Sequence, residues 1–184
     1  MKSITIARNY AEALLLAAVA EGGVDGKVEM YGDLIDAVAG AMHADERIAV
    51  ALESPRVAKA TKARLLANAL RGTAPPSFIR FLQAVVRRGR QGLFAEIAQE
   101  YHVLVDVKLN RVHAGVTLAV ASNGGLPEQI TDRLAQVLGK EVRAHFRTDP
   151  AILGGIVVRV GDRIFDGSLR RKLNALRRKM LTGE

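Results

Sequence analysis

Residues 149–169 read DPAILGGIVVRVGDRIFDGSL and carry the clearest structural pattern in this 184-residue chain. Ile156, Val158 and Val160 alternate with their neighbours at the period of a β-strand, and the alternation resumes after Gly161-Asp162. A two-residue loop that begins with glycine suits the type II′ turn of a β-hairpin. The stretch therefore predicts a hairpin, and it contains no metal cluster, phosphate-binding loop or activated nucleophile.

A basic amphipathic helix is predicted directly after this hairpin. Asp166 or Ser168 can accept hydrogen bonds from its first backbone N–H groups. Apolar residues then recur at helical spacing along one face, at Leu169, Leu173, Leu176 and Met180. Cations occupy much of the remaining surface: Arg170, Arg171, Lys172, Arg177, Arg178 and Lys179. Before the hairpin, Gly154 and Gly155 permit a positive φ or a close backbone approach.

The period of the apolar residues changes from helical to alternating near Asn110. Before it, six amphipathic segments are separated by short loops rich in glycine and proline. After it, the order is strand, helix, strand, hairpin and helix. We expect an α+β protein, with an all-α six-helix bundle over residues 1–110 and a small α+β domain over residues 111–184.

Composition excludes several classes of protein. A hydrophobic content of 49% is enough for folded cores, and the absence of cysteine excludes disulfides, thiolate catalysis and cysteine-based zinc sites. No apolar run approaches the roughly 20 residues that span a bilayer, so we expect no direct membrane span. The formal net charge of +8 is uneven, since residues 1–104 contribute +2 and residues 105–184 contribute +6.

The N-terminus allows two interpretations. Lys2 and Arg8 precede an apolar run over residues 13–20, an arrangement similar to a secretory signal peptide. However, Glu12 interrupts the entry to that run, and the apolar residues from position 6 onward form a helical stripe. We therefore expect a helix of the mature protein here.

The sequence contains no recognisable catalytic or ligand-binding pattern. The four histidines lie far apart in sequence and have no metal-ligand spacing. No lysine followed by serine or threonine completes a phosphate loop after the glycines. Ser168 has no adjacent base and suits a helix cap. We expect no enzyme activity, no metal and no cofactor.

Several stretches together resemble the delta subunit family of the rotary ATP synthase, called the oligomycin-sensitivity conferral protein in mitochondria. The resemblance rests on a pattern from Asp149 to Leu176: an Asp, a Gly-Gly pair, a strand, Gly-Asp, Asp-x-Ser and leucines at helical spacing. It continues in register over nearly the whole chain. Its other parts are ARNYAEAL (residues 7–14), LESPRV (residues 52–57), residues 78–82 and Arg88-Gly89-Arg90.

The resemblance implies a non-catalytic stator connector, present in one copy in a hetero-oligomeric complex. The helical domain would hold the N-terminal helices of the alpha subunits of the catalytic head. The smaller domain would hold the b subunits of the peripheral stalk, so that the stalk resists the torque of the rotor. A peripheral location on the cytoplasmic face of the bacterial inner membrane is implied as well.

The resemblance also implies two sets of binding residues. The alpha-subunit groove would comprise Arg8, Asn9, Tyr10, Ala13, Leu14, Phe78, Phe81, Leu82 and Val85. The stalk site would comprise Gly154, Gly155, Asp166, Ser168, Leu169, Arg170, Leu173 and Arg177. Two other interpretations stay open: the apolar members build the bundle core, and the basic members form a solvated face.

A nucleic-acid-binding module is the alternative function, because clustered lysine and arginine in the last helix are typical of such proteins. Against it, aromatic residues are only 4% of the chain and none lies among the charges of that helix, so stacking on bases is poorly supported. A small-molecule enzyme is a third possibility, for which no group of residues supplies the chemistry.

Overall fold

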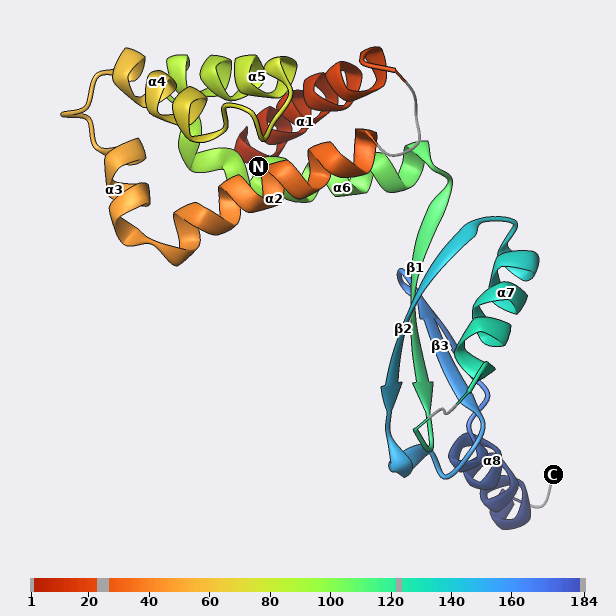
Figure 1. The fold of residues 1–184 in the computed structure, drawn as a ribbon. Helices are drawn as coiled ribbons and strands as arrows, with labels where there is room; N and C mark the ends of the chain where they lie inside the picture. Colours follow the sequence, from red (N-terminus) through yellow and green to blue (C-terminus); the bar gives the residue numbers. More distant parts are fainter. Residues whose placement is uncertain (1, 23–26, 122–123, 183–184) are drawn as a thin grey trace. The chain divides into compact units, whose positions relative to one another are not determined.

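The computed structural model describes residues 2–22, 27–121 and 124–182 of the chain (Figure 1). They form two compact units, Met1–Lys108 and Leu109–Glu184. The first contains only helices among its described residues, and we call it the helical unit. The second combines a sheet with helices, and we call it the sheet unit. The protein is therefore of the α+β class.

Helices of the helical unit follow the segments that the hydrophobic period predicts. α1 and α2 both pack against α6, α4 packs against α5, and α3 packs against the end of α2 (Figure 1). Their bounds are α1 (Lys2–Ala20), α2 (Lys27–Ala44), α3 (Glu46–Glu53), α4 (Lys59–Ala69), α5 (Pro76–Arg87), the short 3-10 helix η1 (Gln91–Leu93) and α6 (Phe94–Lys108).

The ends of α5 illustrate how local sequence sets a helix. The helix begins at Pro76, where a missing N–H costs no hydrogen bond. It ends at Arg87, and after the cap residue Arg88 comes Gly89, whose φ of +69° is the left-handed conformation that glycine adopts without strain. The N–H of Arg90 then donates to the carbonyl of Val85 at 3.1 Å. This hydrogen bond closes the turn that carries Arg88 and Arg90.

Aromatic residues fill the centre of the helical unit. Tyr31, Phe78, Phe94 and Tyr101 are completely or almost completely buried. The hydroxyl of Tyr101 donates to the carbonyl of Val28 at 2.8 Å, so that its polar end is satisfied. Burial raises the pKa of Tyr101 well above its usual value. The hydroxyl of Tyr101 is thus accommodated inside the apolar core.

The sheet unit has four strands in the order β2-β1-β3-β4. β1 and β2 are parallel, as a crossover through α7 requires, and the other two pairs are antiparallel. The elements are β1 (Arg111–Leu118), α7 (Leu126–Leu138), β2 (Glu141–Thr148), the 3-10 helix η2 (Pro150–Ile152), β3 (Ile156–Val160), β4 (Arg163–Asp166) and α8 (Leu169–Thr182).

One face of this sheet is covered and the other is exposed. α7 packs on the covered face, over a small core of Ala114, Val116, Leu118, Val142 and Val158 (Figure 1). Strand residues alternate between the two faces, so the intervening positions point away from α7. The β3–β4 turn has Gly161 at φ +57°, whereas φ of Asp162 is not positive. This combination favours the expected type II′ turn over type I′.

Within the described residues, no helix combines the length and the apolar character needed to cross a bilayer.

Candidate docking surfaces

A hollow lies between the N-terminal half of α1 and the residues that follow α5. We call it the α1–α5 groove; it has a volume of about 440 Å³. Its wall combines apolar, amide and cationic side chains. The lining residues are Ile6, Asn9, Tyr10, Ala13, Arg88 and Arg90.

A row of aromatic rings supports the groove from below. Tyr10 of α1 meets Phe81 of α5 edge to face, with ring centroids 6.3 Å apart. Phe81 in turn lies 6.5 Å from Phe78, which meets Tyr31 of α2 at 5.6 Å. Such aromatic contacts prefer defined orientations, so the row fixes the spacing of α1, α5 and α2.

Hydrogen bonds join the other ends of the same helices, where α1 ends and α5 begins. The Tyr31 hydroxyl donates to the Glu21 carboxylate at 3.0 Å, and Ser77 at the start of α5 bonds to both Glu21 and Tyr31. The Ser77 bond, followed by that of Tyr31, lowers the pKa of Glu21. α1 and α5 are therefore held together by ring packing and, at their ends away from the groove, by a polar network.

The structure separates the nine groove residues expected from the sequence into two sets. Five reach the surface at least in part: Arg8, Asn9 and Ala13 are exposed, and Tyr10 and Phe81 are half-buried. The other four have no exposed surface and belong to the core: Leu14, Phe78, Leu82 and Val85. These four shape the groove from behind, and their side chains do not reach its surface.

Three lining residues were not among the expected ones: Ile6, Arg88 and Arg90. Ile6 belongs to the apolar stripe of α1, so its spacing could have identified it. The two arginines reach the groove because the chain turns at Gly89. A glycine just past a predicted helix indicates such a turn, and this was the signal in the sequence that could have identified them.

A second surface is formed by α8. Its apolar stripe is largely open to solvent: Leu169, Leu173, Leu176 and Met180 are 46%, 54%, 57% and 84% exposed. Four large apolar side chains in line on one helix are far from the scattered single residues of an ordinary surface. Leu169 and Leu173 belong to the expected stalk site, whereas Leu176 and Met180 were expected only as part of the helical pattern.

The basic flank of α8 lies roughly a quarter to half a turn around the helix from the apolar stripe and comprises Arg170, Arg171, Arg177 and Arg178. It borders a hollow of about 610 Å³ that extends along the helix from the cap at Ser168 to Leu181 in the last turn. Four expected residues, Asp166, Ser168, Arg170 and Arg177, line it. The others, which the sequence analysis did not include in the site, are Arg171, Asn174, Arg178 and Leu181.

Gly154 and Gly155 form a joint that holds the start of α8. A side chain at Gly154 would come within 2.7 Å of the Leu169 side chain, and one at Gly155 within 2.4 Å of the Gly167 carbonyl oxygen. Gly155 also has a φ of +78°. The N–H of Leu169 donates to the Gly154 carbonyl at 2.9 Å. Only glycine allows the strand entry and the helix start to approach this closely.

Asp166 and Ser168 cap α8. The Ser168 N–H donates to the Asp166 carboxylate at 2.9 Å, and the Arg171 N–H donates to the Ser168 hydroxyl oxygen at 3.2 Å. Hydrogen bonding from the Ser168 hydroxyl, and next from its N–H, lowers the pKa of Asp166. The Asp-x-Ser pair therefore orients α8, as its sequence position predicts.

The geometry of both surfaces suits binding. Ser168, which lines the α8 hollow, is 4% exposed and accepts a backbone hydrogen bond. Among the described residues, no group of three or more histidine, cysteine, aspartate or glutamate side chains is placed to hold a metal ion. What the two surfaces share is an apolar strip beside arginines, an arrangement that complements an amphipathic helix.

Comparison with known proteins shows a match over nearly the whole chain. Residues 6–180 match the family described as ATP synthase delta (OSCP) subunit. "ATP synthase subunit delta" of Gemmatimonas aurantiaca is 46% identical over 176 residues, covering 96% of this chain and 93% of the relative. The protein of that name from Chlorobium luteolum is 37% identical over 189 residues, covering 100% of this chain and 99% of the relative.

A solved structure supports the fold. A chain in the cryo-EM structure of the Toxoplasma gondii mitochondrial ATP synthase hexamer is similar, with a TM-score of 0.58 at 18% identity. The match covers 95% of this chain and 97% of that chain. The arrangement of helices and strands is thus shared at low sequence identity.

Proposed function

This chain belongs to the ATP synthase delta (OSCP) subunit family, and we propose how its two units divide the work of that subunit. The subunit is a non-catalytic stator connector of the rotary ATP synthase. Its partners are other subunits of that complex, to which it is peripheral. The proposal concerns which surface meets which partner.

We propose that the helical unit, with its six helices acting as one bundle, holds the N-terminal helix of an alpha subunit in the α1–α5 groove. The observation that carries this proposal is the preformed hollow bounded by Ile6, Tyr10 and Ala13 on α1. An amphipathic helix would lay its apolar side chains against these residues. Arg88 and Arg90 would face acidic residues or the negative C-terminal end of the docked helix.

The sheet unit would hold the b subunits of the peripheral stalk through α8. The apolar stripe would pack against an apolar stalk face, and the basic flank would meet acidic residues beside it. Because such charges act over a distance, they would guide assembly more than they set affinity. The glycine joint and the Asp166-Ser168 cap would keep α8 in position under load.

In this arrangement one copy of the chain connects head and stalk, and the stalk opposes the torque of the turning rotor. We place the complex on the cytoplasmic face of a bacterial inner membrane, as the bacterial relatives suggest. The basic residues of α8 then have a role in protein binding, and a nucleic-acid ligand is not needed to explain them.

Pull-down with purified catalytic head and with a b-subunit segment tests this division. The full chain should retain both partners, residues 1–110 should retain only the head, and residues 111–184 should retain only the stalk segment. Ala13→Arg in the groove should weaken head binding in the full chain, and Arg8→Ala on the exposed face of the same helix is the milder control. Retention of both partners by either half would refute the division.

A further inference from the structure

The sheet unit carries another surface, on the face of the sheet that α7 leaves open. We propose that this face binds a protein helix that carries a carboxylate at every fourth residue. We call it the basic sheet face; it comprises His113, Gly115, Arg143, His145, Arg147 and Arg159. It lies on the strands, apart from the α8 stripe, and the inference does not rest on the proposed stalk site.

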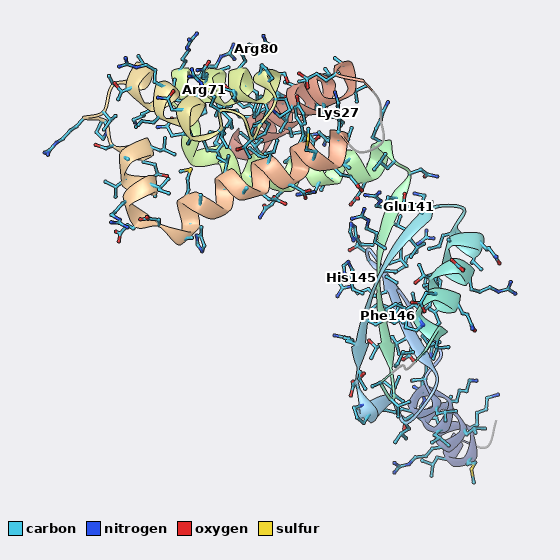
Figure 2. The ribbon with its side chains drawn as sticks, viewed as in Figure 1. Lys27, Arg71, Arg80, Glu141, His145 and Phe146 are labelled. Carbon is cyan, nitrogen blue, oxygen red and sulfur yellow. The ribbon has the colours of Figure 1, made fainter. Side chains whose placement is uncertain are left out.

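Strand register brings these residues together. His113 of β1 pairs with Arg143 of β2, and Gly115 lies between His145 of β2 and Arg159 of β3. Residues of adjacent strands that pair in this way point to the same face. All six residues of the basic sheet face are exposed. Figure 2 labels His145 beside Phe146, the next residue of β2, which packs on the core under α7.

The charge of the face is positive. Arg143, Arg147 and Arg159 are cationic at any physiological pH. Two carboxylates occur at face positions, and both have assigned partners. Glu141 accepts from Arg111 at 2.9 Å at one end of the strands, and Asp166 caps α8 at the other. An anionic partner would therefore gain from the field of the three arginines.

Spacing favours an acidic helix. Arg143, His145 and Arg147 are alternate residues of one strand, so their attachment points are roughly 6.6 Å apart. Every fourth residue of an α-helix advances by about 6 Å. A glutamate at every fourth position of a helix lying along β2 would thus meet each of the three side chains in turn.

Gly115 leaves room for a close approach. A Cβ atom built at this position would come no nearer to another group than 3.9 Å from the Arg159 Cβ. The centre of the face is therefore a low floor between His145 and Arg159. A docked helix can approach the strand backbone there, where a larger side chain would hold it away.

The two imidazoles stack beside this floor. Nδ1 of His113 and Nε2 of His145 are 3.1 Å apart, and the ring planes differ by 12°. Paired imidazoles can bind a metal, but the nearby arginines oppose a divalent cation and favour carboxylates. The described residues of this face include no aromatic ring other than the imidazoles, so base stacking does not favour nucleic acid.

Fluorescence anisotropy with the full chain tests the proposal. The probe is a fluorescein-labelled alanine-rich helical peptide with glutamate at every fourth residue, and its glutamine counterpart is the blank. Binding should be measurable at about 50 mM salt and should weaken as salt is raised. The glutamine peptide should not bind.

Matched variants locate the binding surface. Arg143→Gln combined with Arg147→Gln should weaken binding of the glutamate peptide about tenfold or more. Arg133→Gln combined with Arg163→Gln removes the same charge from exposed residues of α7 and β4, and it should change binding less than about twofold. If the first pair impairs folding, Arg143→Gln alone should still weaken binding about threefold.

NMR provides an independent reading, since the imidazole signals of His113 and His145 should move on addition of the glutamate peptide. Equal weakening by the two double variants would overturn the proposal, as would peptide-induced shifts confined to α8. Tighter binding of a single-stranded oligonucleotide at the same face would replace the protein partner with a nucleic acid. Loss of stalk binding through α8 variants alone leaves this inference intact, which separates it from the proposed function.

Discussion

The two proposed docking surfaces differ in how firmly the rest of the chain holds them. In α5, beside the groove, Phe78, Leu82, Val85 and Val86 are completely buried. In α8 every described side chain is exposed except Ala175, which is half-buried. α8 is anchored mainly at its first turn, through the joint at Gly154 and its contacts with η2.

The proposed binding would therefore differ in mode between the two surfaces. The groove is built on the core, so a helix can dock there without ordering the surface first. The apolar stripe of α8 gains its burial only when a partner covers it. Burial of apolar area contributes about 25 cal/mol per Å², so covering four large side chains is a substantial driving force for association. The helical unit would therefore be stable alone, and α8 would gain order from its partner.

The largest effect is expected from a substitution in the buried core behind the groove. Phe78→Ala should destabilise the helical unit by about 3–5 kcal/mol, because it removes a buried ring that contacts two others. All three tyrosines lie in this unit and the chain has no tryptophan, so tyrosine fluorescence during urea unfolding reports on it alone. Leu176→Ala on α8, the matched control, should change the same signal by less than about 0.5 kcal/mol. Equal losses of stability in the two variants would show that the helical unit and α8 do not differ in this way.

The next prediction concerns the apolar stripe. Leu176→Asp should weaken binding of a b-subunit segment by about 2 kcal/mol or more, roughly thirtyfold, because it places a charge in an apolar interface. Gln129→Asp introduces the same charge at an exposed residue of α7, outside both the apolar stripe and the basic flank, and its effect should stay within about threefold. Titration calorimetry measures both. Similar losses would indicate that net charge governs the interface and that the stripe does not.

A smaller effect is expected at the α8 cap. Ser168→Ala should cost about 1 kcal/mol, confined to the first turn, because the Arg171 N–H loses its acceptor. Amide hydrogen exchange at Arg171 should therefore accelerate, while exchange in α7 should stay the same. Acceleration throughout the sheet unit would instead assign Ser168 a wider structural role.

The same cap should respond to pH. Because the folded-state pKa of Asp166 lies below its ordinary value, its contribution is present above the usual carboxyl range and is lost as pH falls through the lowered pKa. Exchange at the Ser168 amide, followed as pH is lowered, should show this loss. In Asp166→Asn the cap should lose that pH dependence, and a persistent dependence would point to another group.

The smallest effect is expected at the groove rim. Arg88→Gln should reduce the association rate of an alpha-subunit N-terminal peptide a few-fold at low salt and change its dissociation rate little. Stopped-flow kinetics at two salt concentrations measures this. A dominant change in dissociation would mean that Arg88 forms a tight contact and does not act mainly by steering.

Local pattern predicted much of this molecule, because helices and strands follow from the period of their apolar residues. The turn at Gly161 and the cap at Ser168 depend on neighbours along the chain, so sequence shows them directly. Burial is different: Leu14 and Ala13 belong to the same predicted stripe, yet only Leu14 is enclosed. The packing of the helices decides which side of an apolar stripe is left open to a partner. The period of the apolar residues does not contain that information.

Contacts that depend on the register between distant strands could not be predicted from the sequence either. His113 and His145 are 32 positions apart and looked unrelated, but the parallel pairing of β1 and β2 stacks their rings. The basic sheet face arises in the same way, from strands joined through a helix. Arg88 and Arg90 reached the groove through a helix-ending turn whose direction only the fold reveals.

One copy of the chain should hold two neighbours at once through separate surfaces. Native mass spectrometry of the full chain with an alpha-subunit N-terminal peptide and a b-subunit segment measures this. We expect a ternary complex of one copy each, from which Ala13→Arg removes only the alpha peptide and Leu176→Asp removes only the stalk segment. Mutual displacement of the two ligands, or loss of both through either substitution, would contradict it.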